Sequence, residues 1–277
     1  IAGGADRDKG DWDAKLNRSQ TNQGFDRGTV NGKHARRKVS IGIAAGEFVT
    51  VIGSNGAGQS TLLNVVAGKL HPDSGTVTIE GRDVTKLSDH DRASMIGRVF
   101  QDPRAGTAPE MTIEENLAIA YTRGKARGLR RGVTKQRRDR PASWWPPLGP
   151  ALERPLRPRV GTLPGGQRRA LSLLMGTFSE PKIRLLAEHT AALDPRRAAL
   201  VVRLTRELVE RHRPTTLMVT HNMEQALELG DRLIMMHDGE VVVDVSGERK
   251  ARATVADLLS AFEEVRGAEL SDRTLLG

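Results

Sequence analysis

Short apolar runs alternate along most of this chain with stretches in which apolar residues recur at helical spacing. The runs are rich in Val, Leu, Ile and Thr and predict strands at residues 48–52, 96–101, 183–187 and 215–220. Helical spacing predicts helices at residues 62–67, 90–95, 113–121, 168–178, 196–211 and 254–265. Alternating strands and helices of these lengths predict an α/β fold.

Antiparallel strands are expected near the N-terminus and again late in the chain. Residues 38–43 and 47–52 flank a turn at Ala45-Gly46, and residues 76–80 alternate before 81–85 continues their sheet. Residues 232–236 and 240–245 flank Asp238-Gly239, a pair typical of a hairpin turn.

Two segments lack a regular pattern. Residues 1–24 are polar and are expected to be loose, and residues 25–29 suit a turn. Seven of the 13 prolines fall within residues 141–164, and a proline costs ~3 kcal/mol inside a helix, so this segment is predicted to be a loop or to be partly disordered. The basic run 123–140 before it is expected to lengthen a helical region.

Composition narrows the class of protein. The 277 residues carry a net charge of +9, with a pI of about 10.3, which suits either a solvated surface or a nucleic-acid or membrane contact. The chain has no cysteine, so it forms no disulfide framework and no thiolate metal site. No apolar run approaches the ~18–20 residues that span a bilayer, and no secretory signal is visible. The chain begins with Ile1 rather than Met, which is consistent with a fragment or a trimmed product.

A glycine-rich loop between a predicted strand and a predicted helix carries the clearest chemistry. Its residues are Gly53, Ser54, Asn55, Gly56, Ala57, Gly58, Gln59, Ser60 and Thr61. Such a loop turns its backbone N–H groups toward phosphate oxygens, and the helix that follows adds its positive end. The loop fits the phosphate-binding pattern G-x-x-x-x-G-K-[ST] except at Gln59, which replaces the lysine. Phe25, upstream of the loop, suits either a stacking contact with an adenine ring or a small core contact.

Six motifs in order resemble the ATP-binding subunit of an ABC transporter, from about residue 25 to residue 262. Besides the phosphate loop they are the Q-loop glutamine Gln101, the Walker B strand with Glu188 after it, the D-loop with Asp194, the switch histidine His221, and a signature formed by Leu163, Pro164, Gly165, Gly166 and Gln167. The residues 48–61, 97–103 and 217–236 are most similar to bacterial ABC ATPases of uptake systems that use a solute-binding protein.

The resemblance implies an α/β P-loop NTPase of ABC type, with a mixed sheet core, an antiparallel β portion and a helical subdomain. It places the ATP-binding domain at residues 25–265, its helical subdomain at about 104–178, and a tail at 266–277. It implies ATP and Mg²⁺ as ligands, a second ATP-binding subunit and a transmembrane permease as partners, and a peripheral position on the cytoplasmic face of the cell membrane. The surface at 101–115 would meet the permease.

The resemblance also implies a role for each motif. Ser60 and Gln101 would lie at Mg²⁺, Glu188 would polarise the attacking water as general base, and His221 would contact the γ-phosphate. The signature would offer its amides to the ATP of the other subunit.

Three positions depart from the family pattern. Gln59 removes a positive charge; a charge-assisted hydrogen bond contributes ~1.5–3 kcal/mol, so nucleotide affinity is expected to fall roughly ten- to a hundredfold. Ala187 replaces the Walker B aspartate, and Pro164 replaces the signature serine. Arg184 is also unusual, because it stands in an apolar strand, where it must be paired, must reach solvent, or must lie nearer an edge.

Three functions remain open at this stage. The first is a transport ATPase whose hydrolysis is impaired. The second is a non-hydrolysing ABC partner subunit or a decayed paralogue, which the substitutions at residues 59, 164 and 187 favour. The third, an ABC-type ATPase acting on nucleic acid, is less favoured because there is one nucleotide unit, no coiled-coil insertion and no zinc-type cysteine; no nucleic acid is expected as a partner.

Overall fold

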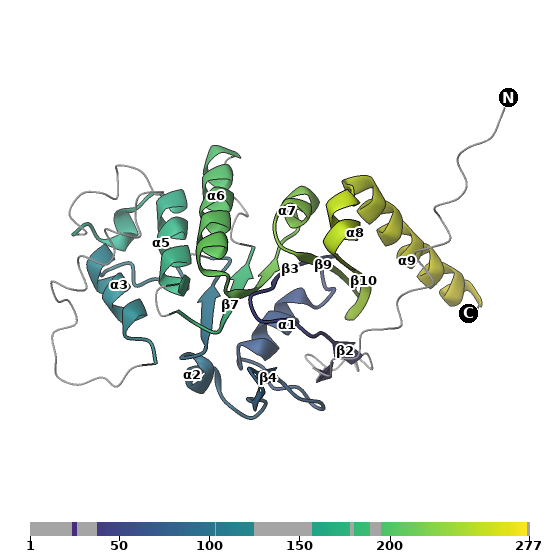
Figure 1. The fold of residues 1–277 in the computed structure, drawn as a ribbon, viewed down its shortest axis with the longest axis horizontal. Helices are drawn as coiled ribbons and strands as arrows, with labels where there is room; N and C mark the ends of the chain where they lie inside the picture. The colour runs from purple at the N-terminus through teal and green to yellow at the C-terminus, as the bar shows by residue number, and fades with distance from the viewer. Residues whose placement is uncertain are drawn as a thin grey trace.

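A central six-stranded sheet carries helices on both faces (Figure 1). A computed structural model describes residues 24–26, 38–102, 104–124, 157–177, 180–188 and 195–275. Across the sheet the strands follow the order β10 (Glu240–Ser246), β9 (Arg232–His237), β3 (Phe48–Gly53), β8 (Thr215–Val219), β7 (Ile183–Ala187) and β6 (Ile96–Val99). Neighbouring strands are parallel except β10 and β9, which are antiparallel.

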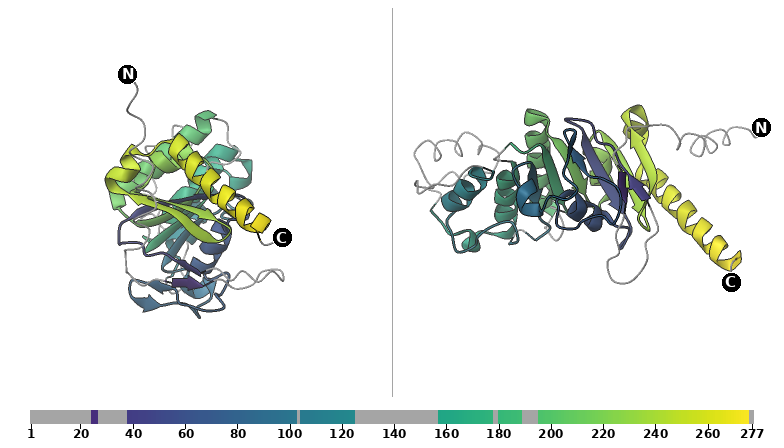
Figure 2. Two further views of the ribbon diagram at one scale, coloured as in Figure 1. Left: turned by 90° about the vertical axis from the view of Figure 1, so that its right-hand side faces the viewer. Right: turned by 90° about the horizontal axis from the view of Figure 1, so that it is seen from below.

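The helices divide between the two faces and the two ends of this sheet. Helices α1 (Gln59–Val66) and α2 (Asp89–Arg92) lie on one side, and α6 (Pro195–His212) and α7 (Met223–Glu228) lie on the other (Figure 1). At the β6 end lie α3 (Ile113–Tyr121), the 3₁₀ turn η3 (Val160–Thr162) and α5 (Gly165–Thr177). At the β10 end lie α8 (Gly247–Arg252) and α9 (Val255–Leu275), and α9 runs outward from the body (Figure 2).

The core has one apolar layer on each face of the sheet. Leu185 and Leu217 pack in the layer that contains α1, whereas their neighbours Leu186 and Met218 pack in the layer that contains α5 and α6. Successive side chains of a strand point to opposite faces, so a sheet covered on both faces needs apolar residues at nearly every position. This requirement explains the unbroken apolar runs in the sequence. A third cluster joins the β9–β10 hairpin to Leu258 of α9.

The main predicted elements are confirmed. The strands and the long helices occur where the sequence pattern put them, and Thr112 and Glu115 form a capping box at the start of α3. The hairpin turns at Asp238 and Gly239, which both adopt the left-handed conformation that a tight hairpin turn requires.

The antiparallel strands near the N-terminus pair differently from the prediction. Phe25 lies in strand β1 (Gly24–Asp26), not in the predicted turn, because β2 (Lys38–Ser40) supplies its hydrogen-bonding partner. Gly46, with φ +77°, does form a turn before β3, but β2 pairs with β1 rather than with β3. β4 (Thr78–Ile79) and β5 (Arg82–Asp83) pair as a separate two-stranded sheet.

Several helix ends differ from the prediction: α1 begins at Gln59 rather than at residue 62, and α2 ends at Arg92 rather than at residue 95. Helices α5 and α9 are longer than predicted. Helix α5 begins at Gly165 rather than at residue 168, because the carbonyl of Pro164 accepts a hydrogen bond from the Arg168 amide and so completes the first turn despite its glycines. Helix α9 continues to Leu275, ten residues past the predicted end, since the residues after 265 are mostly good helix formers even though their apolar spacing fades.

Some predicted features lie outside the described residues. These are the loose segment up to residue 23, most of the basic run 123–140, the proline-rich segment up to residue 156, and Asp194. The described end of the proline-rich segment, residues 157–164, contains only the turn η3 and no α-helix, as its prolines predict.

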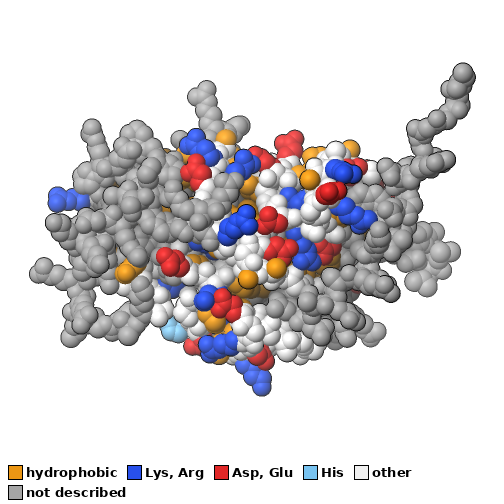
Figure 3. Space-filling model, viewed as in Figure 1, with side chains coloured by type: hydrophobic (Ala, Val, Ile, Leu, Met, Phe, Trp, Pro, Cys, Tyr) orange, Lys and Arg blue, Asp and Glu red, His pale blue; other side chains and the backbone are white. Residues whose placement is uncertain are grey.

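The surface that Figure 3 shows carries mixed charge. Blue Lys and Arg side chains alternate with red Asp and Glu side chains over its described part, without a large field of one sign (Figure 3). Such a face is typical of a solvated surface. Among the described residues, no helix has the length and apolar content needed to cross a bilayer.

Candidate nucleotide site

The glycine-rich loop curls between the end of β3 and the start of α1. Gly56 and Gly58 have φ of +85° and +99°, values that side-chain-bearing residues rarely adopt. A Cβ on Gly53 would stand 2.3 Å from the Met236 carbonyl oxygen, so only glycine fits there. The Ala57 amide donates to the Ser54 carbonyl at 3.0 Å and closes the curl. The loop therefore has the backbone shape that the phosphate-binding pattern requires.

The first turn of α1 is open to an anion. Gly58 occupies the N-cap position and has no side chain that could bond the amides of the first turn. These amides and the positive end of the helix dipole point out of the loop, and Ser60 beside them is exposed. The backbone cradle thus fits the phosphates of a nucleotide.

Gln59 turns back into the loop that holds it. Its side chain is 5% exposed, and its amide nitrogen donates to the Gly53 carbonyl at 3.2 Å. This bond closes the loop but brings no positive charge to the cradle. A bound phosphate therefore meets backbone amides and the helix end, without the lysine charge expected of this loop.

Gln101, Glu188 and His221 meet at the carboxyl edge of the sheet. The Gln101 amide nitrogen donates to Oε2 of Glu188 at 3.0 Å, and Nε2 of His221 contacts Oε1 of the same carboxylate. The three residues follow β6, β7 and β8, which are neighbouring parallel strands, so their carboxyl ends lie side by side. The Glu188 amide donates to the Val219 carbonyl at 2.9 Å, and Glu188 has φ +35°. The strand-end carboxylate is thus held between an amide and an imidazole.

The donor set for a metal is incomplete. Ala187 ends β7 next to Glu188 and packs against the apolar layer that contains α1. Mg²⁺ prefers oxygen ligands, and a methyl group provides none. Within the described residues, no three His, Cys, Asp or Glu side chains lie close enough to hold a metal ion. Ser60 and Gln101 each carry an oxygen of the type that Mg²⁺ prefers, but Ala187 adds no carboxylate.

The signature leads directly into α5. Gly165 is exposed, and a Cβ added to it would meet no atom within 4 Å. Arg168 holds the preceding turn by donating to the carbonyls of Val160 at 3.1 Å and Gly161 at 2.6 Å. The two signature glycines, Gly165 and Gly166, therefore begin a helix, and the turn that precedes this helix is held in place by Arg168.

The ABC transporter family profile matches residues 36–191, more than half of the chain. The chain belongs to the ABC transporter family. It is 44% identical over 225 residues to a tyrosine transport ATP-binding protein of Clostridioides difficile, covering 81% of this chain and 89% of that protein. It is 29% identical over 243 residues to an aliphatic sulfonates import ATP-binding protein of Agrobacterium fabrum, covering 87% and 84%.

Solved structures of ATP-binding cassettes share the fold. A dimeric cassette in a post-hydrolysis state, bound to ADP and Pi, superposes with a TM-score of 0.67 at 29% identity, covering 80% of this chain and 95% of that one. A nucleotide-free cassette from an ABC transporter gives a TM-score of 0.70 at 25% identity, covering 84% and 94%. The fold class expected from the resemblance, an α/β P-loop NTPase of ABC type, is therefore confirmed.

For two predicted site residues of this ABC subunit, the side chains lie outside the described part of the structure. The Phe25 backbone pairs with Val39 in the β1–β2 sheet, but its side chain lies outside the described part of the structure. Asp194 also lies outside it. The adenine-stacking and D-loop roles remain predictions.

Sequence reasoning missed two residues that the fold brings to the site. Arg169 of α5 is 6% exposed and donates to the Gln101 carbonyl at 2.7 Å, which ties the signature helix to the Q-loop. Burial lowers the pKa of Arg169, and the charge of Asp102 opposes this shift. His237, at the end of β9, lies 3.3 Å from the Ser54 hydroxyl. Neither position stands out in the sequence, because both contacts join segments far apart in the chain.

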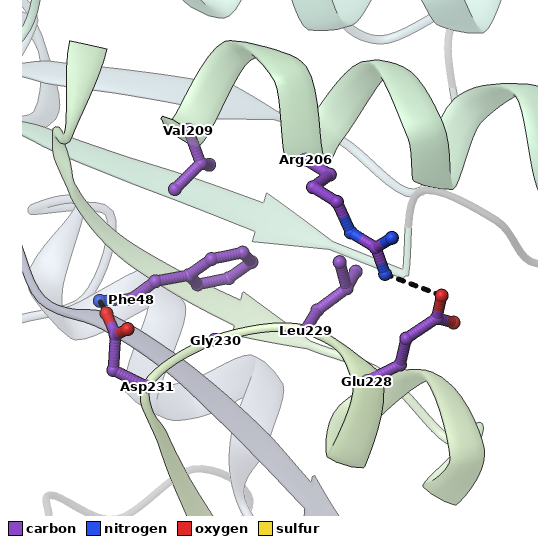
Figure 4. A pocket seen from close by; sticks show the side chains of 7 residues that line it. All are labelled: Phe48, Arg206, Val209, Glu228, Leu229, Gly230 and Asp231. Atoms are coloured by element: carbon purple, nitrogen blue, oxygen red, sulfur yellow. Dashed lines mark hydrogen bonds and ion pairs between the residues drawn. The ribbon is translucent and has the colours of Figure 1, made fainter. Parts of the chain in front are cut away.

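A small hollow of about 150 Å³ lies at the opposite edge of the sheet, where β3 begins (Figure 4). Phe48 lines it, and Arg206 and Glu228 close one side with an ion pair of 2.5 Å. On the other side Asp231 accepts a hydrogen bond from the Phe48 amide at 2.9 Å. Its place at the amino end of β3 separates this hollow from the nucleotide site.

Proposed function

We propose that this ABC subunit binds ATP with Mg²⁺ at the loop 53–61 and couples that binding, with impaired hydrolysis, to solute uptake through a membrane permease. The observation that carries the proposal is that Gln101 and His221 both contact the carboxylate of Glu188. This contact lies at the edge of the sheet where the phosphate loop begins. This arrangement suits phosphoryl transfer to water, in which positioning and charge stabilisation do most of the work.

Each residue has a task that its position allows. The loop amides and the open end of α1 bind the phosphates. Glu188 accepts a proton from the attacking water, Gln101 orients that water, and His221 donates a hydrogen bond toward the transferred phosphate. Mg²⁺, when bound by Ser60 and Gln101, supplies charge neutralisation, which the absence of a carboxylate at Ala187 weakens.

The assembly and solute are proposed from the relatives. Two ATP-binding subunits would face each other so that residues 163–167 of one complete the site of the other; a similar cassette is dimeric. The 44% identical relative is named for tyrosine transport, so tyrosine is the first solute to test, with a solute-binding protein in the same system. The complex would lie on the cytoplasmic face of the cell membrane, and the proposed domain limits are 25–265 with a helical subdomain at 104–178 and a tail at 266–277.

Equilibrium binding of Mg-ATP tests this proposal directly. The natural chain and a Gln59→Lys variant are compared by titration, with Thr61→Ser as a matched loop control. A lysine adds a charge-assisted bond, so the Gln59→Lys variant should bind Mg-ATP about ten- to a hundredfold more tightly than the natural chain. Absence of binding by both the natural chain and the Gln59→Lys variant would reject a nucleotide function for this loop.

A second function, that of a non-hydrolysing partner, is favoured by the three departures at Gln59, Pro164 and Ala187. It is tested by phosphate release from the assembled transporter, with Glu188→Gln as the baseline. Turnover above that baseline identifies a slow ATPase. Turnover equal to it, together with co-purification of an intact ABC subunit, identifies a partner that binds without hydrolysing.

A further inference from the structure

The β9–β10 turn packs directly behind the phosphate loop. The Met236 carbonyl occupies the space beside Gly53, and the Gly239 amide donates to the Ala57 carbonyl at 3.0 Å. One side of the loop thus rests on this turn, while its other side is open to a ligand. Any movement of the turn changes the support of the loop.

His237, which ends β9 at this turn, touches two elements that are distant in sequence. Its Nδ1 lies 3.3 Å from the Ser54 hydroxyl of the phosphate loop. Its ring meets the ring of Phe262 on α9 edge to face, with centroids 5.6 Å apart and an angle of 83°. The side chain is only 9% exposed, so both contacts are shielded from water.

Helix α9 is attached to the body through the same region. Leu258 is 3% exposed, and it packs with Phe262 into the cluster formed by the β9–β10 hairpin and Ala226. Leu259, the next residue of the helix, is 47% exposed and makes no part of this cluster. One stripe of α9 therefore determines where the Phe262 ring stands against His237.

We propose that His237 is a positioning residue of the nucleotide site, which holds Ser54 in place and transmits the position of α9 to the phosphate loop. The loop is rich in glycine, so ordering it when a nucleotide binds costs conformational entropy. The hydrogen bond to Ser54 and the ring contact to α9 order part of the loop before binding, which lowers this cost. The inference about affinity rests on the proposed function; the effect on the loop itself does not.

Hydrogen exchange of the full-length chain without nucleotide tests the coupling. Phe262→Ala removes the ring contact, and Leu259→Ala, three residues away on the exposed side of α9, is the matched control. Phe262→Ala should speed exchange of the Ala57 and Gly239 amides at least threefold, and Leu259→Ala should leave them unchanged. Faster exchange confined to α9 in Phe262→Ala would show that the helix packs without reaching the loop and would overturn the proposal.

Variants of the histidine separate its polar contact from its packing. His237→Phe keeps a ring against Phe262 but cannot bond Ser54, whereas His237→Asn keeps a polar group that can reach the hydroxyl. His237→Phe and Ser54→Ala should each speed exchange of the Ala57 amide by similar factors, and the double variant should add nothing further. His237→Asn, which keeps the polar contact but loses the ring contact, should match Phe262→Ala. Independent, multiplying effects of His237→Phe and Ser54→Ala would overturn the role of this contact.

Mg-ATP affinity then extends the test to function. In the Gln59→Lys background, Phe262→Ala and His237→Phe should weaken binding about three- to tenfold, while Leu259→Ala should not. Unchanged affinity beside faster loop exchange would overturn the positioning role. If the Gln59→Lys chain itself fails to bind, the proposed function fails, and the exchange experiment still decides the coupling.

Discussion

At the scale of single residues, Arg184 is the most costly feature of the sheet. It lies in β7, which is next to the edge strand β6 and pairs with β8 on its other side, so lying nearer an edge does not expose it. The side chain is 3% exposed; its Nη1 donates to the Leu208 carbonyl at a long 3.4 Å, and its Nε has no hydrogen-bond partner. Burial lowers the pKa of Arg184 to about 10, and only Glu180 opposes this shift. Within the part of the chain that the structure describes, the charge neither reaches solvent nor gains a close carboxylate.

Replacing this arginine should therefore stabilise the fold. Arg184→Met fills similar volume without a charge, and such replacements of buried ionic groups gain up to about 1–4 kcal/mol. The gain should shrink above pH 10, because there the unfolded chain holds the Arg184 proton more tightly than the folded chain does, so the natural chain gains stability as pH rises. Urea unfolding of both chains at pH 7 and pH 11 measures this; a less stable Met variant at pH 7 would contradict it.

A second residue-scale prediction concerns Gly230. It has φ +79°, and a Cβ there would stand 2.6 Å from the Phe48 carbonyl oxygen. Gly230→Ala should cost about 1–3 kcal/mol from strain, and more if the backbone cannot shift. Gly81→Ala is the matched control, because Gly81 has φ +77° but nothing within 4 Å of its Cβ position. Thermal unfolding compares the two; equal losses would mean that the contact with Phe48 is unimportant.

At the scale of elements, the helix ends decide how the site is presented. Helix α3 begins with a complete capping box at Thr112 and Glu115, whereas α5 begins after Pro164, which has no side-chain acceptor. At the far end of the fold, the Lys250 ammonium donates to the carbonyls of Leu227 and Leu229 and closes the end of α7; burial lowers the pKa of this lysine. The segment that leads into the signature helix is thus held by Arg168 rather than by a side-chain cap.

Restoring a cap at α5 gives a clear test. Pro164→Ser introduces a hydroxyl three residues before Gln167, the spacing of a capping box, and should stabilise the chain by about 1 kcal/mol. Pro164→Ala supplies neither the hydroxyl nor the proline ring and controls for the loss of proline. The free energy of unfolding in urea is the measurement. A gain in Pro164→Ala as large as that in Pro164→Ser would show that removal of the ring, not the cap, is responsible.

At the scale of the whole molecule, ligand binding and stability are linked. A ligand that binds only the folded chain raises its melting temperature in proportion to the logarithm of its concentration over Kd. The site joins α1, three strand ends and α5, so a nucleotide bound there stabilises both sides of the sheet together. The metal should contribute little in the natural chain, since Ala187 offers no oxygen.

Removing magnesium should therefore have a small effect on the natural chain and a large one on a repaired chain. In Ala187→Asp, Mg-ATP should raise Tm by roughly 3–6 °C more than ATP with EDTA, because a tenfold gain in affinity is about 1.4 kcal/mol. The natural chain should show a smaller difference. Calorimetry with and without EDTA measures both; an equal magnesium effect in the two chains would place the metal away from residue 187.

The order and type of elements follow from the sequence alone. Strands covered on both faces must be apolar throughout, and helices must repeat their apolar residues every three to four positions. These patterns are local, so the elements can be predicted from them. The phosphate loop could also be predicted from its own pattern, whereas Gln101, Glu188 and His221 were predicted as site residues through the resemblance to ABC ATP-binding subunits.

Tertiary structure alone decided which of these residues meet. The strand order placed three strand ends around Glu188, paired β2 with β1, and buried Arg184 between two neighbours. Gln59 turned back onto Gly53, and Arg169 and His237 joined the site from distant segments. No local pattern encodes such contacts, because each joins two segments that are far apart in the chain. These segments come together only when the sheet and its two apolar layers assemble.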